Sequence, residues 1–215
     1  GAIAEEALRR CAISFGETVV LYGLGLLGLL AGQIAAAAGY YVIGLDVDER
    51  RLALARELGM IDVHDPSGID VVELVRSRTA GFGADAVVLG VVTPSSEPLS
   101  LALEMSRQHA RVVGLGVFGM TLERDLLSDR SVIRSIAYGP GRYDPAYEEN
   151  NIDYPIGIVR WTENRNAQHV IRLMAEGRLR TEPLARRFPA ADAPAAYDLL
   201  RSPERPPTIQ LAWEG

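Results

Sequence analysis

Lysine is absent from the sequence: all 22 basic residues among its 215 are arginines. The chain therefore cannot supply the lysine that grips phosphate in a P-loop, the amine of a Schiff base, or the lysine of a Tyr-x-x-x-Lys catalytic pair. Cysteine is nearly absent, because Cys11 is the single one. This excludes a disulfide or a cysteine-rich zinc site within the chain, and with no base nearby we expect Cys11 to be a packed, unreactive side chain.

Basic clusters and long apolar runs are also missing. The formal net charge is −6, and no cluster of arginines offers the surface that a nucleic acid needs. The most apolar window, residues 19–38, is interrupted by glycines and is typical of a strand, a turn and a helix, not of a membrane span. Glu5 and Glu6 precede Arg9 and Arg10, which is not the order of a signal peptide. We therefore predict a soluble, cytoplasmic protein with no nucleic-acid or membrane partner.

A glycine-rich turn near the N-terminus is the strongest positive signal. Residues 18–22 form a short apolar run rich in β-branched side chains, typical of a buried parallel strand. Gly23, Gly25 and Gly28 follow with the G-x-G-x-x-G spacing, which permits a tight turn, a close approach to pyrophosphate and close packing of helix on strand, respectively. The helix expected over residues 26–38 would direct unpaired N–H groups and its dipole at this turn, so an anion is the expected occupant.

A second strand and an acid complete the pattern of a dinucleotide site. Residues 41–45 are apolar and lead to Asp46, 18 residues after Gly28, near the position where dinucleotide folds place the acid that binds the adenosine ribose. Arg51 has two interpretations: its side chain lies over the adenine, or it is a solvated charge on the surface of the next helix. The pattern predicts nucleotide binding; the alternative is a degenerate fold that keeps its glycines for packing.

Alternating strand and helix patterns predict a doubly wound parallel α/β sheet, a Rossmann fold of about six strands in the order 3-2-1-4-5-6 with a C-terminal appendage. Strands are expected at residues 18–22, 41–45, 60–64, 85–92, 111–117 and 131–137, helices at 2–14, 26–38, 48–59, 69–79, 98–109, 163–176 and 193–201, and a terminal strand at 208–213. The corresponding division is a lead-in helix (1–17), a dinucleotide-binding domain (18–138), a long polar and aromatic loop (139–162), and C-terminal helices and a strand (163–215). This last part is expected to pack on the core or on another domain.

The histidines do not suggest a metal site. We expect His109 at the solvated end of its helix and His169 on an exposed helix face. Asp62, His64 and Asp65 are interpreted as a surface turn, because their spacing scatters them over both faces of a strand end, whereas a metal needs ligands that converge.

The loop over residues 139–161 combines turn formers with aromatic and charged side chains. A long loop in a compact domain is either functional or disordered, and the aromatic content favours order. If the loop places a substrate, Tyr143, Tyr147 and Arg160 are the candidate catalytic residues. The alternative is a structural or interfacial loop.

From end to end the chain resembles the cofactor-binding domain and C-terminal tail of the medium-chain, zinc-type alcohol dehydrogenase superfamily. The residues that carry this resemblance are the helix leading into Gly16-Glu-Thr-Val-Val, the glycine turn 23–28, Asp46 with Arg51, Glu57-Leu-Gly59, Phe188-Pro and Ala195-Ala-Tyr-Asp-Leu-Leu200. The segments Gly141-Arg-Tyr-Asp-Pro-Ala-Tyr-Glu-Glu, Tyr154-Pro-Ile-Gly and Arg160-Trp-Thr-Glu are similar to bidomain oxidoreductases, in which such a half is fused to one like glucose-fructose oxidoreductase or inositol dehydrogenase.

The resemblance implies hydride transfer between a nicotinamide cofactor and an alcohol or carbonyl substrate. It implies that Asp46 binds the adenosine ribose and repels a 2′-phosphate, so NAD(H) is expected in preference to NADP(H). The implied cofactor-binding residues are Gly23, Gly25, Leu26, Leu27 and Gly28 at the pyrophosphate, Asp46, Val47 and Arg51 at the adenosine, Gly90, Val91 and Val92 at a ribose, and Leu115, Gly116 and Val117 at the nicotinamide amide.

One large part of the family's pattern is missing from this sequence. In the family an N-terminal catalytic domain supplies the zinc ligands, and that region has no counterpart here. Cys11 and the scattered His64, His109 and His169 cannot rebuild such a site, so we expect no zinc bound by this chain. The sequence is that expected of either an excised fragment or a natural separate chain whose catalytic half is supplied by another polypeptide.

Two other functions stay open. A non-catalytic nucleotide-sensing or assembly module would account for the missing catalytic groups. An S-adenosylmethionine-dependent methyltransferase also uses a glycine turn and a strand-end acid, but it is disfavoured because Tyr22 stands before Gly23, where that class usually has an acid. A homodimer is expected in every case, because residues 118–122 would form an edge segment able to pair across a twofold axis.

Overall fold

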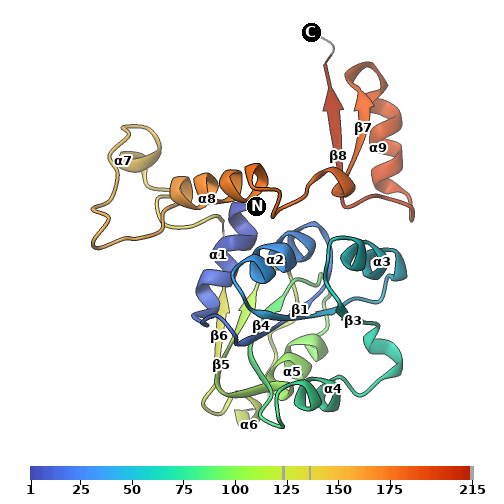
Figure 1. The fold of residues 1–215 in the computed structure, drawn as a ribbon, viewed down its shortest axis with the longest axis vertical. Helices are drawn as coiled ribbons and strands as arrows, with labels where there is room; N and C mark the ends of the chain where they lie inside the picture. Colours follow the sequence, from blue (N-terminus) through green and yellow to red (C-terminus); the bar gives the residue numbers. More distant parts are fainter. Residues whose placement is uncertain (123, 136, 214–215) are drawn as a thin grey trace.

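The computed structural model describes residues 1–122, 124–135 and 137–213. Its centre is a parallel sheet of six strands in the order β3-β2-β1-β4-β5-β6 (Figure 1), which confirms the predicted Rossmann-type fold. The strands are β1 (Thr18–Tyr22), β2 (Tyr41–Leu45), β3 (Asp62–His64), β4 (Ala84–Leu89), β5 (Ser106–Gly114) and β6 (Ser131–Arg134). The order reverses between β1 and β4, where a fold of this kind forms its ligand crevice.

Helices cover both faces of the sheet (Figure 1). One face carries α1 (Ala2–Cys11), α2 (Leu26–Ala37) and α3 (Glu49–Glu57), and the other carries α4 (Val71–Arg78), α5 (Glu97–Glu104) and α6 (Arg124–Leu127). Alternate residues of each central strand enter the two cores: Val19 and Leu21 pack with α1 and α2, whereas Val20 packs with α4 and α5. Because both faces are covered, the central strands are mainly apolar, as the sequence indicates.

One predicted helix is too long. The prediction of a helix over residues 98–109 is wrong beyond Glu104, because β5 already begins at Ser106, and His109 lies within this strand instead of at a helix end. The pairing explains the difference: Ala84 pairs with Ser106, but Ala86 pairs with Arg111, so the intervening residues of β5 bulge from the ladder. His109 accordingly has a φ of 61°.

The segment 139–162 is a folded loop that contains the short helix α7 (Pro145–Glu148) and leads into α8 (Glu163–Ala175). Helix α8 packs on α1 through a polar network centred on the buried Asn166. His169 belongs to the same network, because its Nδ1 lies 2.7 Å from a carboxylate oxygen of the buried Glu5. The expectation that His169 lies on an exposed helix face is therefore wrong.

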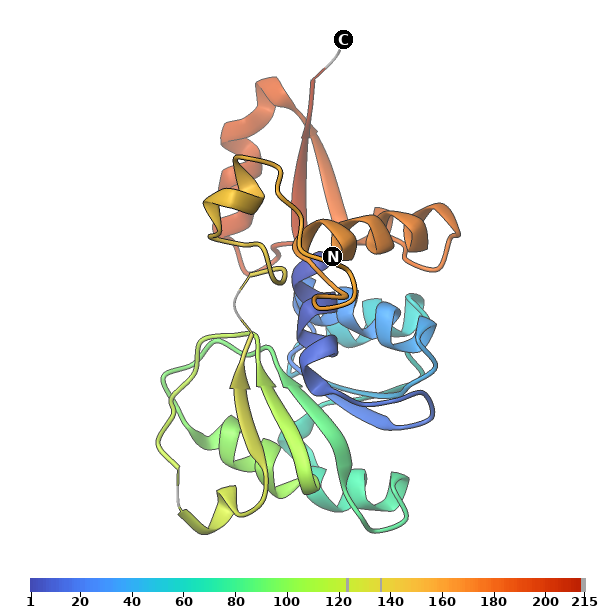
Figure 2. The ribbon, with the colours of Figure 1, turned by 90° about the vertical axis from the view of Figure 1, so that its left-hand side faces the viewer.

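The C-terminal unit stands apart from the six-stranded sheet (Figures 1 and 2). It consists of β7 (Ala185–Pro189), α9 (Ala193–Arg201) and β8 (Thr208–Ala212), and its two strands pair in parallel. Helix α9 and the terminal strand were predicted, whereas β7 was not. The chain reaches this unit past Gln33 of α2, whose side-chain oxygen accepts a 2.8 Å hydrogen bond from the Arg180 N–H.

The segment 118–122 is a loop and not a strand. The Gly119 N–H donates to the Ser95 carbonyl oxygen at 3.1 Å, and the Thr121 N–H donates to the Ser96 hydroxyl at 3.0 Å, so this segment folds onto the loop after β4. Among the strands of the described chain, β6 is the outermost on this side, and the homodimer stays a prediction. Of the helices in the described parts, none is long and apolar enough to cross a membrane.

Candidate functional site

Three strand ends meet at the carboxyl edge of the sheet through close backbone approaches. The Gly90 N–H donates to the Tyr22 carbonyl oxygen at 2.8 Å, and a Cβ on Gly23, whose φ is 106°, would lie 2.9 Å from the Gly90 carbonyl carbon. A Cβ on Gly116 would overlap the Val91 carbonyl oxygen. Side chains at positions 23 and 116 would push β1, β4 and β5 apart, so these glycines set the shape of the crevice.

Helix α2 begins beside this crevice with its first turn uncapped by a side chain. Its N-cap is Gly25, and the Leu29 N–H donates to the Gly25 carbonyl oxygen at 2.9 Å as the first helical bond. The N–H groups of the three residues between them have no place in the helical ladder. A Cβ on Gly28 would overlap the Gly23 carbonyl oxygen, whereas a Cβ on Gly25 would meet no described atom within 4 Å. Gly28 is thus needed for packing, and Gly25 faces open space that fits an anion.

Asp46 lies at the end of β2, against the glycine turn. Its Oδ2 accepts a hydrogen bond from the Leu24 N–H at 2.7 Å, and its Oδ1 accepts one from the Asp48 N–H at 2.9 Å. Arg51 covers the carboxylate from outside, with Nη1 3.2 Å from Oδ2, which leaves Asp46 only 4% exposed. Arg51 therefore forms an ion pair with Asp46. The sequence had suggested instead a place over the adenine or on a solvated helix surface. A carboxylate oxygen can accept two hydrogen bonds, so Oδ1 can also accept one from a sugar hydroxyl.

A cavity of about 410 Å³ adjoins the glycine turn and α3. It is lined by Gly25, Leu26, Asp48, Arg50, Arg51 and Leu54 and, from the C-terminal unit, by Leu200, Glu204, Arg205, Pro206 and Pro207. Arg50 holds Asp48 through two side-chain hydrogen bonds of 3.0 and 2.7 Å, which lower the pKa of the Asp48 carboxyl. Arginines outnumber carboxylates in this lining, which suits a diphosphate. The contribution of the C-terminal unit was not predicted from the sequence, because these residues are distant along the chain from the glycine turn.

The other predicted cofactor residues reach the same edge of the sheet. Val47, Val92 and Val117 follow the ends of β2, β4 and β5, and their side chains are among the exposed large apolar ones. Val92 forms a parallel bridge with Val117, which joins the last two of these ends. Leu115 and Gly116 both donate their N–H groups to the Leu89 carbonyl oxygen. Exposed apolar side chains beside a polar turn offer walls against which flat rings can pack.

The candidate catalytic residues do not come together. Tyr143 is exposed, with the guanidinium of Arg142 4.2 Å from its ring centroid, and Arg160 lies over the Trp161 ring at 4.1 Å. Tyr147 instead donates from its hydroxyl to Thr162 Oγ1 at 2.8 Å and lines a different cavity, beside α8. No shared site for the three side chains is formed within the described residues.

Zinc ligands are not assembled either. Asp62 lies 2.5 Å from His64 Nε2 and 3.1 Å from Arg78 Nε, as expected for a surface ion pair. Cys11 is buried, and burial raises the pKa of its thiol to about 12. In the described ranges, no group of three histidine, cysteine, aspartate or glutamate side chains could hold a metal ion. The residues present therefore do not fit zinc.

The strand order and the glycine turn at the switch point define the class of Rossmann-type α/β domains. Residues 27–150 match the family model described as zinc-binding dehydrogenase, and the chain belongs to this family. It corresponds to the nucleotide-binding domain of the medium-chain alcohol dehydrogenase superfamily, as the resemblance implied. The narrower resemblance of the loop to bidomain oxidoreductases stays a prediction.

Several dehydrogenases are similar to this chain. Sorbitol dehydrogenase of Halalkalibacterium halodurans is 34% identical over 154 residues, which are 67% of this chain and 44% of that protein. Alcohol dehydrogenase TADH from Thermus sp. ATN1 matches 99% of this chain and 57% of its own, with a TM-score of 0.73 and 26% identity. An alcohol dehydrogenase from E. coli CFT073, complexed with NADH, matches 98% of this chain and 56% of its own, with a TM-score of 0.75 and 18% identity.

The chain spans about half the length of these relatives.

Proposed function

We propose that this chain binds NAD(H) as the nucleotide-binding domain of an oxidoreductase that acts on an alcohol or carbonyl group. The observation that carries the proposal is the open space at Gly25, where the uncapped first turn of α2 faces the cavity lined by Arg50, Arg51 and Arg205. A diphosphate at this point would accept hydrogen bonds from backbone N–H groups and meet the positive end of the helix dipole. Residues 18–138 form the nucleotide-binding unit in this proposal, preceded by the lead-in helix 1–17 and followed by 139–162 and 163–215.

Asp46 supports a preference for NAD(H) over NADP(H). A carboxylate at this place would accept hydrogen bonds from ribose hydroxyls and repel a 2′-phosphate. Arg51 would be the natural partner of a 2′-phosphate, but its guanidinium is already engaged 3.2 Å from Asp46 Oδ2. We expect NADH to bind at least about tenfold more tightly than NADPH when both are titrated by fluorescence, a difference of about 1.4 kcal/mol. Equal affinities would contradict this preference.

The nicotinamide supplies the hydride chemistry when it is bound, and the chain's own residues bind and orient it. Leu115, Gly116 and Val117 would receive the amide end, and Gly90, Val91 and Val92 a ribose. Relatives named sorbitol dehydrogenase, D-arabitol-phosphate dehydrogenase and erythritol/L-threitol dehydrogenase support an alcohol substrate that carries further hydroxyl groups. We keep Tyr143, Tyr147 and Arg160 as candidate catalytic residues.

Gly25→Ala tests the proposal, because it separates binding from folding. A Cβ at position 25 meets no described atom within 4 Å and the φ of −67° suits alanine, so the variant should fold. The same Cβ would occupy the space that the diphosphate needs. We expect NADH affinity, measured by fluorescence titration, to fall at least about tenfold, while the circular dichroism spectrum stays unchanged.

Gly68→Ala is the matched control. Gly68 also has open space within 4 Å of its Cβ position among the described atoms, but it lies in the turn after β3, away from α2. NADH affinity should be unchanged in this variant. If Gly25→Ala binds NADH as tightly as the wild type, or if the wild type binds neither redox state, the proposal is wrong.

The homodimer belongs to the same proposal. Among the described strands, β6 pairs with β5 alone, so its other edge can pair with a second chain. We expect light scattering to give the mass of a dimer. A monomer at high protein concentration would remove this part of the proposal.

A further inference from the structure

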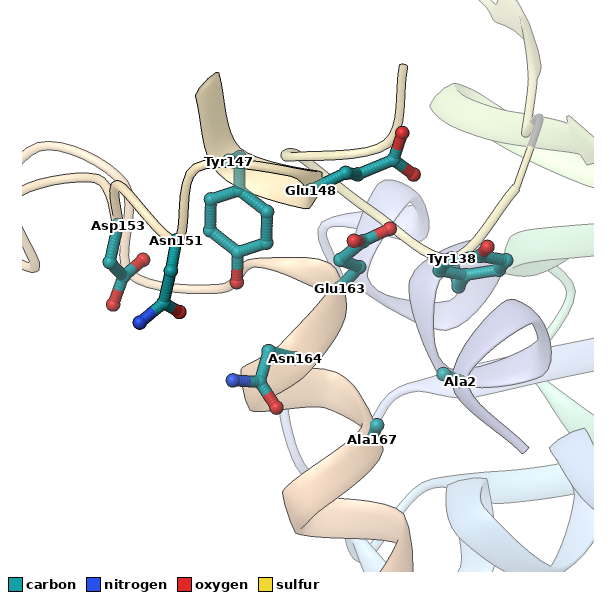
Figure 3. Close-up of a pocket in the computed structure, with 9 residues that line it drawn as sticks. All are labelled: Ala2, Tyr138, Tyr147, Glu148, Asn151, Asp153, Glu163, Asn164 and Ala167. Carbon is teal, nitrogen blue, oxygen red and sulfur yellow. The ribbon is translucent and has the colours of Figure 1, made fainter. Parts of the chain in front are cut away.

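A second cavity lies between the folded loop 139–162 and the first turns of α1 and α8. This loop cavity has a volume of about 420 Å³, within the range of small-molecule sites. Its polar lining includes the carboxylates Glu148, Asp153 and Glu163 and the amides Asn151 and Asn164. Figure 3 shows Glu148 and Glu163 close together on one side, and Asn151 with Asp153 on the other. None of the described residues that line it is an arginine or a histidine.

Arginines outside the lining balance most of this negative charge. Arg142 is paired with Glu148, and Arg165 Nη2 lies 2.6 Å from Asp153 Oδ2. Glu163 has a buried oxygen, Oε2, without a hydrogen-bond partner among the described residues. Burial raises the pKa of the Glu163 carboxyl, and the negative charge of Glu148 raises it further. The cavity is thus rich in hydrogen-bonding oxygens and amides but nearly balanced in charge.

The near balance of charge in the loop cavity favours some classes of ligand over others. A phosphorylated or carboxylate ligand would meet carboxylates, amides and tyrosine side chains among the described lining residues, and no cationic side chain. A divalent cation is disfavoured, because no three acidic, histidine or cysteine side chains in the described ranges converge as metal ligands do. Hydroxyl groups suit the lining best, since each can donate to a carboxylate and accept from an amide N–H.

The loop that forms the cavity is held by specific contacts. The Tyr147 ring stacks on Tyr154, with centroids 5.5 Å apart, and its hydroxyl donates to Thr162 at 2.8 Å. The Tyr154 hydroxyl donates to Asp144, the N-cap of α7. Gly141 has a φ of 106°, and a Cβ there would press on the Tyr147 ring at 2.7 Å. A cavity fixed in this way loses little entropy when it binds a ligand.

The loop cavity lies on the same side of the sheet as the glycine turn. Tyr138 lines the cavity and follows the end of β6. Figure 2 shows the loop 139–162 beyond the arrowheads of the parallel strands, on the side to which these strands point. The glycine turn after β1 lies on the same side. In a doubly wound sheet this is the side on which ligands bind.

We propose that the loop cavity binds a neutral polyhydroxylated compound, a polyol or a sugar. Asn164 and Glu163 are the residues that set this specificity, by hydrogen bonds to the hydroxyl groups of the ligand.

The test is isothermal titration calorimetry of the full chain with sorbitol and myo-inositol as neutral probes, and with sorbitol 6-phosphate as the charged comparator. We expect the neutral probes to bind, and the phosphate ester to bind at least about tenfold more weakly. Asn164→Ala and Glu163→Gln should each weaken sorbitol binding about tenfold, because the first removes the amide that hydrogen-bonds a hydroxyl group and the second replaces a charged acceptor by a weaker, neutral one. Glu176→Gln, at the other end of α8 and outside the lining, is the control for the loss of a carboxylate and should bind as the wild type does.

NADH is titrated into the same samples. Failure of NADH to bind would overturn the proposed function but not polyol binding in the loop cavity. The polyol proposal is overturned if neither neutral probe binds while NADH does, if the phosphate ester binds more tightly, or if both cavity variants bind sorbitol as the wild type does. Asn164 is exposed, so its replacement leaves a folded protein in which these outcomes can be read.

Discussion

Within the glycine turn, three residues of the same type have separate physical roles. Gly23 needs its positive φ, Gly28 needs the missing Cβ for contact with the Gly23 carbonyl, and Gly25 needs neither within the protein. Gly28→Ala should therefore lower the free energy of unfolding by about 1–3 kcal/mol, because the backbone must move to accept the methyl group. Urea unfolding followed by circular dichroism measures this change. Stability equal to that of the wild type would show that the backbone of the turn accommodates the methyl group without a loss of stability.

Cys11 offers a second test at the scale of one residue. Its side chain is buried in the core between α1 and α2, its thiol donates to the Ala7 carbonyl oxygen at 3.4 Å, and burial raises its pKa to about 12. Only the thiolate reacts with alkylating agents, so native Cys11 should be unreactive toward iodoacetamide at pH 8 and should react once the chain is unfolded in urea. The extent of labelling is read by mass spectrometry. Rapid labelling of the native protein would contradict the burial of this side chain.

Single residues with a positional signature were predictable, and their partners were not. Asp46 was identified because it follows a strand at a fixed interval from Gly28, and this information is local. Its bond from the Leu24 N–H and its cover by Arg51 depend on how the turn and α3 sit in space. Arg205, which lines the same cavity, is more than 150 residues from the turn and carries no local signal.

At the scale of elements, the contact between α1 and α8 depends on one buried amide. Asn166 Oδ1 accepts a 2.8 Å hydrogen bond from Arg9 Nε, and its Nδ2 donates to Glu6 and to the Tyr138 carbonyl oxygen. Asn166→Ala removes the hydrogen bonds to Arg9 Nε, Glu6 Oε2 and the Tyr138 carbonyl oxygen, and we expect a loss of about 3 kcal/mol in the free energy of unfolding. Urea denaturation measures it.

Asn164→Ala is the matched control for this prediction, because Asn164 is exposed on the same helix. Its replacement should change the stability by less than about 0.5 kcal/mol. If both variants lose the same stability, the polar network does not hold α8 to α1.

The elements that the sequence predicted poorly are those whose structure depends on a distant partner. Strand β7 contains two arginines and a proline and has no apolar alternation, so its pairing with β8 could not be read locally. The start of β5 was predicted as the end of a helix because residues 106–109 are polar. In the structure, however, Ser106 pairs with Ala84 and belongs to the sheet. Strands β1, β2 and β4 were predictable because burial on both faces demands continuous apolar runs.

At the scale of the whole molecule, the six-stranded domain and the C-terminal unit have different roles. The six-stranded domain carries the glycine turn, Asp46 and the strand ends, whereas the C-terminal unit adds an outer wall to the cavity beside the glycine turn through Leu200 and residues 204–207. The connection between them runs past Gln33 and the buried Leu184, so a chain that ends at Leu184 keeps the contacts of the core.

We expect this truncated chain to retain the unfolding midpoint of the nucleotide-binding domain and to bind NADH about tenfold more weakly, because one wall of the cavity and the charge of Arg205 are lost. Differential scanning calorimetry and NADH fluorescence titration measure the two quantities.

Arg205→Ala in the full chain separates the effect of charge from that of shape. A loss of NADH affinity close to that of the truncation assigns the effect to the guanidinium, and a small loss assigns it to the wall. Unchanged NADH affinity in the truncated chain would show that the cofactor binds without the C-terminal unit. A large fall in the unfolding midpoint would mean that the two parts fold as one.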